Sequence, residues 1–318
     1  MSPPLSIGKL QFKHRLIQGP LAGYSCAPFR ALFSHFTQPA YCVSEMLSAH
    51  DVLQKHSDHG RYLYRSPQEN LLCYQISGTD PTVMANAALK LEALGADLID
   101  INCGCPKPKI RKKGAGSALL EQPQQLIKLI KSVRNAIQCP LTVKIRLQGN
   151  DNDMQIAQSI ADAGADALIV HGRHWTEDYD TPCNFQQIGL IKRSIPIPVI
   201  ANGDISSIDT LHQAITHSHC DGFMISRAST GKPWLFQELL SSSVMNINIE
   251  EKMNLFISHL KALANLENEY QAVLQSKSLV RYYFKNRLTQ EFLQQYYTLS
   301  NLKEIETLCK FVHLEVIC

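Results

Sequence analysis

The sequence has little net charge and no segment resembling a membrane anchor. Its 318 residues hold 31 lysines and arginines against 28 acidic residues, a formal net charge of +3 at pH 7. Any nucleic-acid site must therefore come from local clusters of basic residues and not from a global field. No run approaches the ~18 apolar residues that a membrane-spanning helix needs, and residues 1–10 lack the apolar stretch of a signal peptide. We expect a cytoplasmic protein with no membrane partner.

The ten cysteines show no spacing typical of a disulfide framework. They are scattered along the chain, so we expect reduced thiols, as in the cytoplasm. Cys103 and Cys105 flank one glycine and could form half of a metal site, but no second pair stands at matching spacing. We therefore expect no metal, and nothing in the sequence indicates an obligate protein partner.

What the sequence does contain is an alternation of short apolar runs and helical patterns. Most of the apolar runs are continuous, as parallel strands buried on both faces require. Eight strands alternating with helices predict an α/β fold, a closed (β/α)8 TIM barrel over residues 1–240. The predicted strands are Arg15–Gln18, Ala40–Ser44, Leu71–Ile76, Asp97–Asn102, Leu141–Arg146, Ala167–His171, Pro198–Ala201 and Gly222–Ser226. The predicted helices include Pro81–Leu94, Pro123–Ile137, Met154–Ala163 and Ile208–Thr216.

The pattern changes after Leu240. Residues 246–318 contain no proline and no glycine, and they show several amphipathic helical stretches without a convincing strand. We therefore expect a second, small all-helical domain over residues 241–318, with the boundary near Ser241–Ser243.

Polar residues stand at the carboxyl ends of the predicted strands, the rim where barrels of this kind hold their active sites. Lys144 is the most unusual, because an ammonium inside an apolar strand is costly to bury without a partner. So many polar ends on one rim are hard to explain by packing, and they predict a ligand site. The ends are Gly19–Gly23, Gln75–Gly78, Asn102–Pro106, Lys144–Arg146, His171–Arg173, Asn202–Asp204 and Ser226–Arg227.

The last two of these loops indicate the kind of ligand. Barrels commonly bind phosphate at the loops after the seventh and eighth strands. Gly203 lets the backbone approach a phosphate closely, and Arg227 can bind two of its oxygens. Lys144 can stabilise negative charge on a cofactor ring, and Gln75 offers a donor and an acceptor to a ring's amide edge. A phosphate at one end and an imide-like ring at the other describe FMN.

In order and spacing, these motifs resemble those of the tRNA-dihydrouridine synthases. The resemblance is strong over residues 7–240 and weaker over the helical tail. The matching segments are Pro20–Gly23, Asn102–Pro106, Lys144–Arg146, His171–Arg173 and Asn202–Asp204. Other segments look most like the bacterial B class, namely Val43–Met46, Gly116–Leu120, Arg227–Ala228 and Gly231–Trp234.

The resemblance implies an enzyme that reduces uridines of the tRNA D loop to dihydrouridine, with bound FMN and with NADPH as the reductant. It assigns the proton donor to Cys105 and a uracil contact to Asn102. Ser226 departs from the family, which usually has glycine there. The FMN contacts that we expect, Asp204 included, are Pro20, Leu21, Ala22, Gln75, Lys144, His171, Asn202, Gly203, Asp204, Ser226 and Arg227.

A cysteine suits this chemistry. Reducing the uracil 5,6 double bond takes a hydride at C6, which reduced flavin supplies, and a proton at C5. A free cysteine has a pKa of about 8.5, so it is mostly a thiol near neutral pH and can donate that proton. The sequence has no Rossmann-type dinucleotide motif, which fits transient binding of NADPH over the flavin.

Two clusters of basic residues predict contact with a polynucleotide. Residues 101–120 contain no acidic residue, and they include a basic loop formed by Lys107, Lys109, Arg111, Lys112 and Lys113. In the tail, Lys277, Arg281 and Lys285 are spaced i, i+4, i+8 on one helix face, with Arg287 nearby. We expect both clusters, together with Arg173, to contact tRNA.

Two other functions remain open from the sequence. An FMN barrel acting on a free pyrimidine or on dihydroorotate would share the flavin site and the cysteine, but it would not need the basic loop or the helical tail. A flavin-free RNA-binding barrel belongs to a different class. The presence of Lys144, His171 and Cys105 argues against that second alternative.

Overall fold

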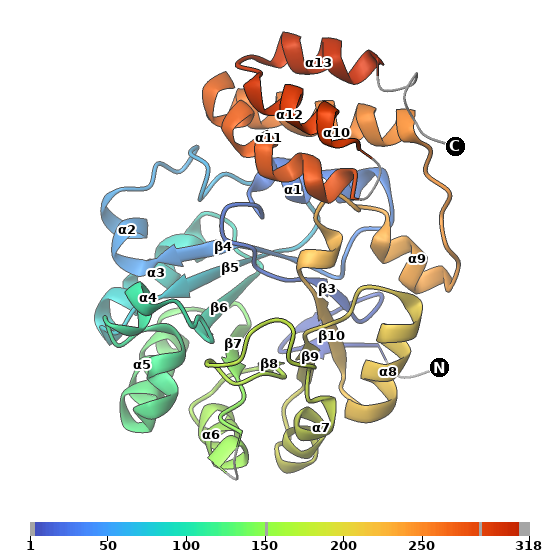
Figure 1. Ribbon diagram of the computed structural model, residues 1–318. Coiled ribbons are helices and arrows are strands. Elements are labelled where there is room, and N and C mark those ends of the chain that lie inside the picture. Colours follow the sequence, from blue (N-terminus) through green and yellow to red (C-terminus); the bar gives the residue numbers. More distant parts are fainter. Residues whose placement is uncertain (1–3, 150–151, 286–287, 312–318) are drawn as a thin grey trace.

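Eight parallel strands form a closed barrel in this computed structural model, which describes residues 4–149, 152–285 and 288–311 (Figure 1). Their order around the barrel is β10-β3-β4-β5-β6-β7-β8-β9, so the predicted (β/α)8 fold is confirmed. The strands are β3 (Leu16–Gln18), β4 (Cys42–Ser48), β5 (Leu72–Ser77), β6 (Leu98–Cys103), β7 (Leu141–Arg146), β8 (Ala167–His171), β9 (Val199–Asn202) and β10 (Gly222–Ile225).

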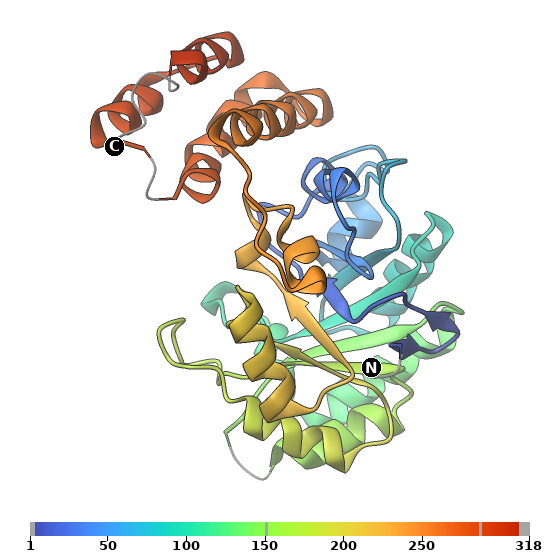
Figure 2. The same cartoon turned by 90° about the vertical axis from the view of Figure 1, so that its right-hand side faces the viewer.

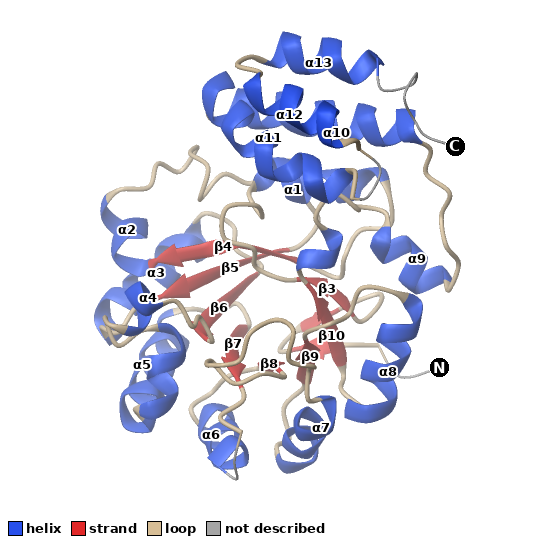
Figure 3. Ribbon diagram, in the orientation of Figure 1, coloured by secondary structure: helices blue, strands red, loops and turns tan. Residues whose placement is uncertain are grey.

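Helices surround the ring of strands (Figure 3). Helices α3 and α5 begin at the prolines that the sequence indicated, and the Asp80 carboxylate caps α3 by accepting from the Val83 N–H. The outer helices are α1 (Ala27–Ala31), α2 (Ala49–Gln54), α3 (Pro81–Ala93), α4 (Pro108–Arg111), α5 (Pro123–Ala136), α6 (Asn152–Asp162), α7 (Phe185–Ser194), α8 (Ile208–Ser218) and α9 (Leu235–Ser241). Short 3-10 turns are η1 (Leu32–His35), η2 (Gly116–Glu121) and η3 (Arg227–Ser229), and β1 (Ser6–Ile7) pairs with β2 (Leu10–Gln11).

The barrel interior changes from apolar to polar along the strands. Because side chains alternate between the two faces of a strand, residues two apart share a face. In β5, Cys73 is followed on its face by Gln75, and in β8, Ile169 is followed by His171. The apolar member of each pair belongs to a small buried cluster at the amino ends of the strands, and the polar member lines the cleft at their carboxyl ends. The alternation of side chains along each strand therefore places Gln75 and His171 in the cleft.

Strand β4 is longer than predicted. Ala40–Ser44 was the expected strand, but the pairing with β5 continues to Ser48, with an irregular register between Val43 and Met46. The charged Glu45 interrupts the apolar pattern. Its buried carboxylate is satisfied by the Gly23 N–H and by the Arg61 guanidinium, whose Nε lies 2.8 Å from Oε1.

Four helices of the tail lie together on one side of the barrel, next to α1 (Figures 1 and 2). They are α10 (Ile249–Leu266), α11 (Glu269–Tyr283), α12 (Gln290–Thr298) and α13 (Leu302–Phe311). Their buried side chains, including Phe256 and Tyr296, form a cluster that also contains Cys26 and Leu32 of the barrel. The division at residue 240 stays a prediction. In the described part of the chain, no helix is long and apolar enough to cross a membrane.

The tail is joined to the barrel by polar contacts as well. Arg61, which follows α2, pairs with Glu267 of the tail and donates to the Gln275 side chain at 2.9 Å. Gln275 in turn donates to the Gly23 carbonyl oxygen at 2.8 Å. Tyr24 packs edge-on against Tyr282 of α11, with ring centroids 5.6 Å apart. The loop after β3 is thus held by the tail.

Candidate active site

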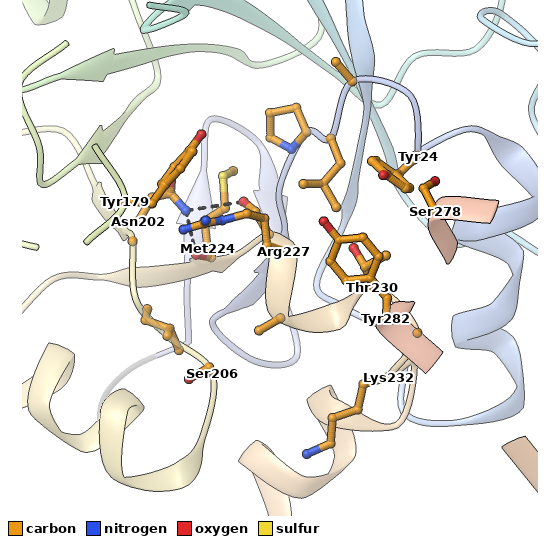
Figure 4. A pocket seen from close by; sticks show the side chains of 18 of the residues that line it. Tyr24, Tyr179, Asn202, Ser206, Met224, Arg227, Thr230, Lys232, Ser278 and Tyr282 are labelled. Carbon is orange, nitrogen blue, oxygen red and sulfur yellow. Dashed lines mark hydrogen bonds between the residues drawn. The ribbon is translucent and has the colours of Figure 1, made fainter. Parts of the chain in front are cut away.

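A cleft of about 1800 Å³ opens at the carboxyl ends of the barrel strands and extends to the face of α11 (Figure 4). Among the described residues, no group of histidines, cysteines and acids could hold a metal ion. The structure brings most of the predicted residues together here, namely Pro20, Leu21, Ala22, Gln75, Asn102, Cys105, Lys107, Lys144, His171, Asn202, Gly203, Asp204, Ser226, Arg227, Lys277, Arg281 and Lys285. Arg287 lies outside the described residues.

Lys144 lies at the base of the cleft, in β7 beside Asn102 of β6. Its side chain is 9% exposed, and its ammonium makes no hydrogen bond or ion pair with any residue that the structure describes. Burial lowers the pKa of Lys144, and the nearby Asp100 carboxyl opposes that shift. A buried cation without a protein partner fits a ligand that presents an acceptor or negative charge at this point.

His171 lines the cleft as a neutral imidazole. Burial lowers the pKa of His171 to about 2, and the charges of Lys144 and Arg146 add to this effect. Its Nε2 lies 3.2 Å from an Arg173 guanidinium nitrogen. Because a guanidinium only donates, Nε2 must accept, and the ring proton must be on Nδ1. The Nδ1–H is therefore the group that His171 can offer to a ligand.

Arg173 does not occupy the position that we expected of a tRNA contact. It is 1% exposed, and its guanidinium binds both oxygens of Asp204 at 2.6 and 2.7 Å. It also donates to the carbonyl oxygens of Tyr179 and Thr181. Arg173 therefore holds the loop between β8 and α7, and its predicted contact with tRNA is corrected to this positioning role.

The loop after β9 allows a ligand to approach its backbone closely. Gly203 has a φ of +123°, and a Cβ there would lie 2.6 Å from the Cys183 sulfur. The Asn202 side chain donates to the Met224 carbonyl oxygen at 2.9 Å and so ties this loop to β10 (Figure 4). The positive φ of Gly203 and the hydrogen bond from Asn202 to β10 together place the backbone after β9 at the edge of the cleft.

The loop after β10 places Arg227 at the edge of the cleft. Arg227 is exposed and forms no ion pair within the described part of the chain, while its guanidinium lies 3.6 Å from the centroid of the Tyr179 ring. The Ser226 hydroxyl is accommodated because residue 19 is glycine, where a Cβ would lie 2.3 Å from it. Ser226 thus fits against Gly19, and Arg227 remains available to an anion.

The two neighbouring cysteines have different surroundings. Cys103 is fully buried in the core, whereas Cys105 is half-buried and lines the cleft. The Cys105 N–H donates to Asn102 Oδ1 at 3.0 Å, and the Asn102 amide nitrogen donates to Gln75 Oε1 at 2.9 Å. These bonds leave Asn102 one N–H for a ligand.

Sequence reasoning missed Asp100. It lies two residues before Asn102 on the same face of β6, is 1% exposed, and accepts hydrogen bonds from Gln75 and Thr142. A charged residue inside an apolar strand was the signal that identified Lys144, and the same signal could have identified Asp100. Glu45 and Arg61 were also missed, because their pairing joins distant parts of the chain.

The residues of the basic loop differ in whether they contact other side chains of the protein. Lys107 lines the cleft, whereas Lys109, Lys112 and Lys113 are exposed outside it. Arg111 pairs with Glu121 at 2.6 Å and lies over the Trp175 ring at 3.6 Å from its centroid. Arg111 is therefore committed to contacts within the protein.

The basic face of α11 forms one wall of the cleft. Lys277 donates to the Tyr297 carbonyl oxygen at 2.9 Å, and Arg281 donates to the Tyr297 hydroxyl at 2.6 Å. Lys285, just after the helix, is exposed. Of this row, Lys285 is the cation least engaged with the protein.

Fold and site together define a (β/α)8-barrel enzyme with a cation-lined cleft that holds an accessible cysteine. A family model described as dihydrouridine synthase (Dus) matches residues 17–315. The chain belongs to the dihydrouridine synthase family, an oxidoreductase family.

Named relatives agree with this assignment. The chain is 35% identical to tRNA-dihydrouridine synthase B of Vibrio vulnificus, over 88% of this chain and 89% of that protein. It is 32% identical to tRNA-dihydrouridine synthase B of Shewanella oneidensis, over 98% and 99% of the two chains. The old yellow enzyme homologue from Zymomonas mobilis shares the fold with a TM-score of 0.54 at 13% identity, over 78% of this chain and 94% of that chain.

Proposed function

We propose that this protein is a tRNA-dihydrouridine synthase that reduces uridines of the tRNA D loop, with bound FMN and with NADPH as the reductant. The observation that carries the proposal is the continuity of one cleft, which has Lys144 and Cys105 at the strand ends and Lys277 and Lys285 on its wall. A dehydrogenase of a free pyrimidine or of dihydroorotate needs the strand ends but not the basic wall. The D loop is proposed from the similarity to B-class relatives.

The residues of the cleft fit FMN. The unpartnered Lys144 ammonium can bind an electron-rich edge of the ring, and Gln75 retains an amide N–H for the same ring. At the other end, Gly203 permits close approach of the backbone to a phosphate, and Arg227 has no acidic partner among the described residues. His171 offers its Nδ1–H between these two ends. Pro20, Leu21 and Ala22 supply a further wall.

Cys105 would act as the general acid of the reaction. When bound and reduced, FMN supplies a hydride for C6 of the uracil ring. The Cys105 thiol then gives its proton to C5, so the 5,6 double bond gains two hydrogens and the cysteine becomes a thiolate that solvent reprotonates. Asn102 holds the Cys105 backbone and keeps one N–H for the uracil. The basic residues of the wall would bind the phosphates around an extruded uridine and offset the cost of its unstacking.

The proposal includes a cytoplasmic location. The cysteines that the structure describes are all free, which fits a reducing compartment. The proposed substrate, tRNA, is also found in the cytoplasm.

The test is reconstitution with defined components. The purified protein is loaded with FMN, reduced with NADPH without oxygen, and given unmodified tRNA transcript, free uridine or dihydroorotate in separate reactions. We expect FMN binding and dihydrouridine in the D loop of the tRNA, measured by mass spectrometry of nuclease fragments. Turnover of a free pyrimidine or of dihydroorotate without modification of tRNA would refute the substrate, and failure to bind FMN would refute the cofactor.

A further inference from the structure

A chain of buried hydrogen bonds leads from the barrel interior to the Cys105 backbone. The Thr142 hydroxyl donates to Asp100 Oδ1 at 2.6 Å, and Gln75 Nε2 donates to Asp100 Oδ2 at 2.8 Å. Asn102 Nδ2 donates to Gln75 Oε1 at 2.9 Å, and Asn102 Oδ1 accepts from the Cys105 N–H at 3.0 Å. The four side chains are buried, so water does not replace their partners.

The polarity of this chain is set at one end. An ionised carboxylate only accepts hydrogen bonds, so Gln75 must turn its nitrogen toward Asp100 and its oxygen toward Asn102. Asn102 must then turn its nitrogen toward Gln75 and its oxygen toward the N–H groups of Gly104 and Cys105. Each amide could fill the same space in the flipped orientation, and the carboxylate at one end and the two backbone N–H groups at the other decide between the two.

We propose that Asp100 is a positioning residue that orients the Gln75 and Asn102 amides and thereby fixes the backbone from which Cys105 presents its thiol to the cleft. Its consequence for uridine reduction rests on the proposed function, but its effect on the Cys105 backbone does not. Burial raises the pKa of Asp100 to about 7, and the hydrogen bonds from Thr142 and Gln75 and the charge of Lys144 oppose this shift only in part.

Asp100→Asn keeps the shape of the side chain and replaces one acceptor oxygen by a donor NH2 group. If the oxygen of the substituted amide accepts from Thr142, its nitrogen faces the Gln75 nitrogen, and Gln75 must flip. Asn102 must then flip as well, and its nitrogen faces the Gly104 and Cys105 N–H groups. If the amide oxygen instead accepts from Gln75, the amide nitrogen donates to the Thr142 hydroxyl, which can also accept, and the chain keeps its direction. Asp100→Leu removes the acceptor altogether, so it is the variant that leaves the Gln75 nitrogen without its partner.

Gln75→Glu moves the carboxylate one step along the same chain. Alone, it places two carboxylates against each other, which costs stability. Combined with Asp100→Asn, it restores every donor to an acceptor, because the new carboxylate accepts from the substituted amide on one side and from Asn102 on the other. The double variant should therefore recover what Gln75→Glu alone loses, which simple filling of the core by Asp100 does not predict.

The test uses the full-length protein without FMN, so that the role of Gln75 toward the cofactor does not enter. Iodoacetamide labelling of Cys105 is followed by peptide mass spectrometry in the wild type, the single variants Asp100→Leu and Gln75→Glu, and the Asp100→Asn/Gln75→Glu double variant. We expect labelling to be faster in each single variant by about fivefold, the factor that one net hydrogen bond contributes to an equilibrium. The double variant should return to the wild-type rate.

Asp97→Asn is the matched control, because Asp97 just precedes the same strand and binds the Leu72 N–H and Arg65 far from Cys105. It should lower thermal stability without changing Cys105 labelling. Wild-type labelling in Asp100→Leu, or a double variant as altered as Gln75→Glu, would overturn the proposal. If Asp100→Leu or Gln75→Glu does not fold, the double variant decides, since folding with wild-type labelling supports the proposal and failure to fold refutes it. If labelling follows the expected pattern while wild-type enzyme does not reduce tRNA, the proposed function fails and the positioning role stands.

Discussion

One nitrogen of the Arg173 guanidinium contacts both oxygens of the Asp204 carboxylate, and this ion pair joins the loops after β8 and β9 at the edge of the cleft. Arg173 is 1% exposed and Asp204 is about one-third exposed, so the pair is partly screened by solvent. Asp204 has a left-handed φ of +49°, and its carboxylate also accepts from the Cys183 N–H at 2.8 Å. One salt bridge therefore sets the position of two loops that frame His171.

Arg173→Met should destabilise the protein and loosen these loops. We expect a loss of about 2–3 kcal/mol in the free energy of unfolding, because several buried hydrogen bonds disappear while Asp204 keeps partial access to water. Urea denaturation of the FMN-free protein measures this loss. Arg193→Met, at an exposed arginine of α7, should stay within about 0.5 kcal/mol of wild type. Equal urea midpoints for the two variants would show that Arg173 is not a structural clamp.

Lys144→Met should separate cofactor binding from stability. The substitution removes a buried ammonium that has no partner in the described structure, so the FMN-free protein should be as stable as wild type or more stable. Affinity for FMN should fall by at least about tenfold, the size of one charge-assisted hydrogen bond. Flavin fluorescence titration and thermal melting give the two values. Lys131→Met, on the exposed face of α5, should change neither, and unaltered FMN affinity in Lys144→Met contradicts the assignment.

Lys285→Glu should weaken tRNA binding without affecting the fold. The side chain is exposed, and a single exposed charge change moves stability by less than about 0.5 kcal/mol. The log–log salt dependence of tRNA affinity should become shallower by about one unit for each phosphate that the variant no longer binds. Lys277→Glu should do the same but also cost about 1 kcal/mol, because Lys277 donates to the Tyr297 carbonyl oxygen. Wild-type affinity and slope in both variants would mean that this face of α11 does not contact tRNA.

Stability should fall in mild acid, partly because of His259. Burial lowers the pKa of His259 to about 3, and its Nε2 has no partner among the described residues. Between that value and the unfolded pKa of about 6.5, only the unfolded chain binds the proton, so stability is lost as the pH falls. His171, with its pKa lowered to about 2, acts in the same direction.

His259→Leu should remove one of these two contributions. The loss in unfolding free energy between pH 7.5 and pH 5.0 should shrink by about 2 kcal/mol relative to wild type. Chemical denaturation at the two pH values measures it in FMN-free protein. An identical pH dependence in the variant would show that His259 is protonated in the folded state.

The sequence allowed the barrel and most of the cleft to be predicted, because both follow from local rules. A period of two in the strands places Gln75 and His171 on the inner face, and the barrel topology brings their ends to one rim. The errors come from pairings across the chain. Arg173 as a strand-end cation suits a phosphate as well as a carboxylate, and only the fold shows that Asp204 neutralises it.

Arg111 illustrates the same limit. Its residue type and its place in an acid-free loop predict tRNA contact, which stays a prediction, whereas its contacts with Glu121 and Trp175 could be found only from the fold. Ser226 shows the opposite case, where a departure from the family is explained by a neighbour, Gly19, that leaves space for the hydroxyl.

The most direct test of the central claim is a single-turnover reaction of Cys105→Ala with unmodified tRNA. The FMN-loaded, prereduced variant is mixed with tRNA without oxygen, and dihydrouridine is counted by mass spectrometry against Cys103→Ala, which removes the neighbouring buried thiol. If Cys105 donates the proton, the Cys105 variant should form dihydrouridine at least about 100-fold more slowly, the usual contribution of a general acid. It should still bind FMN and oxidise NADPH, and Cys103→Ala should retain activity. Dihydrouridine formation by Cys105→Ala at the wild-type rate would contradict the role of Cys105 as the proton donor.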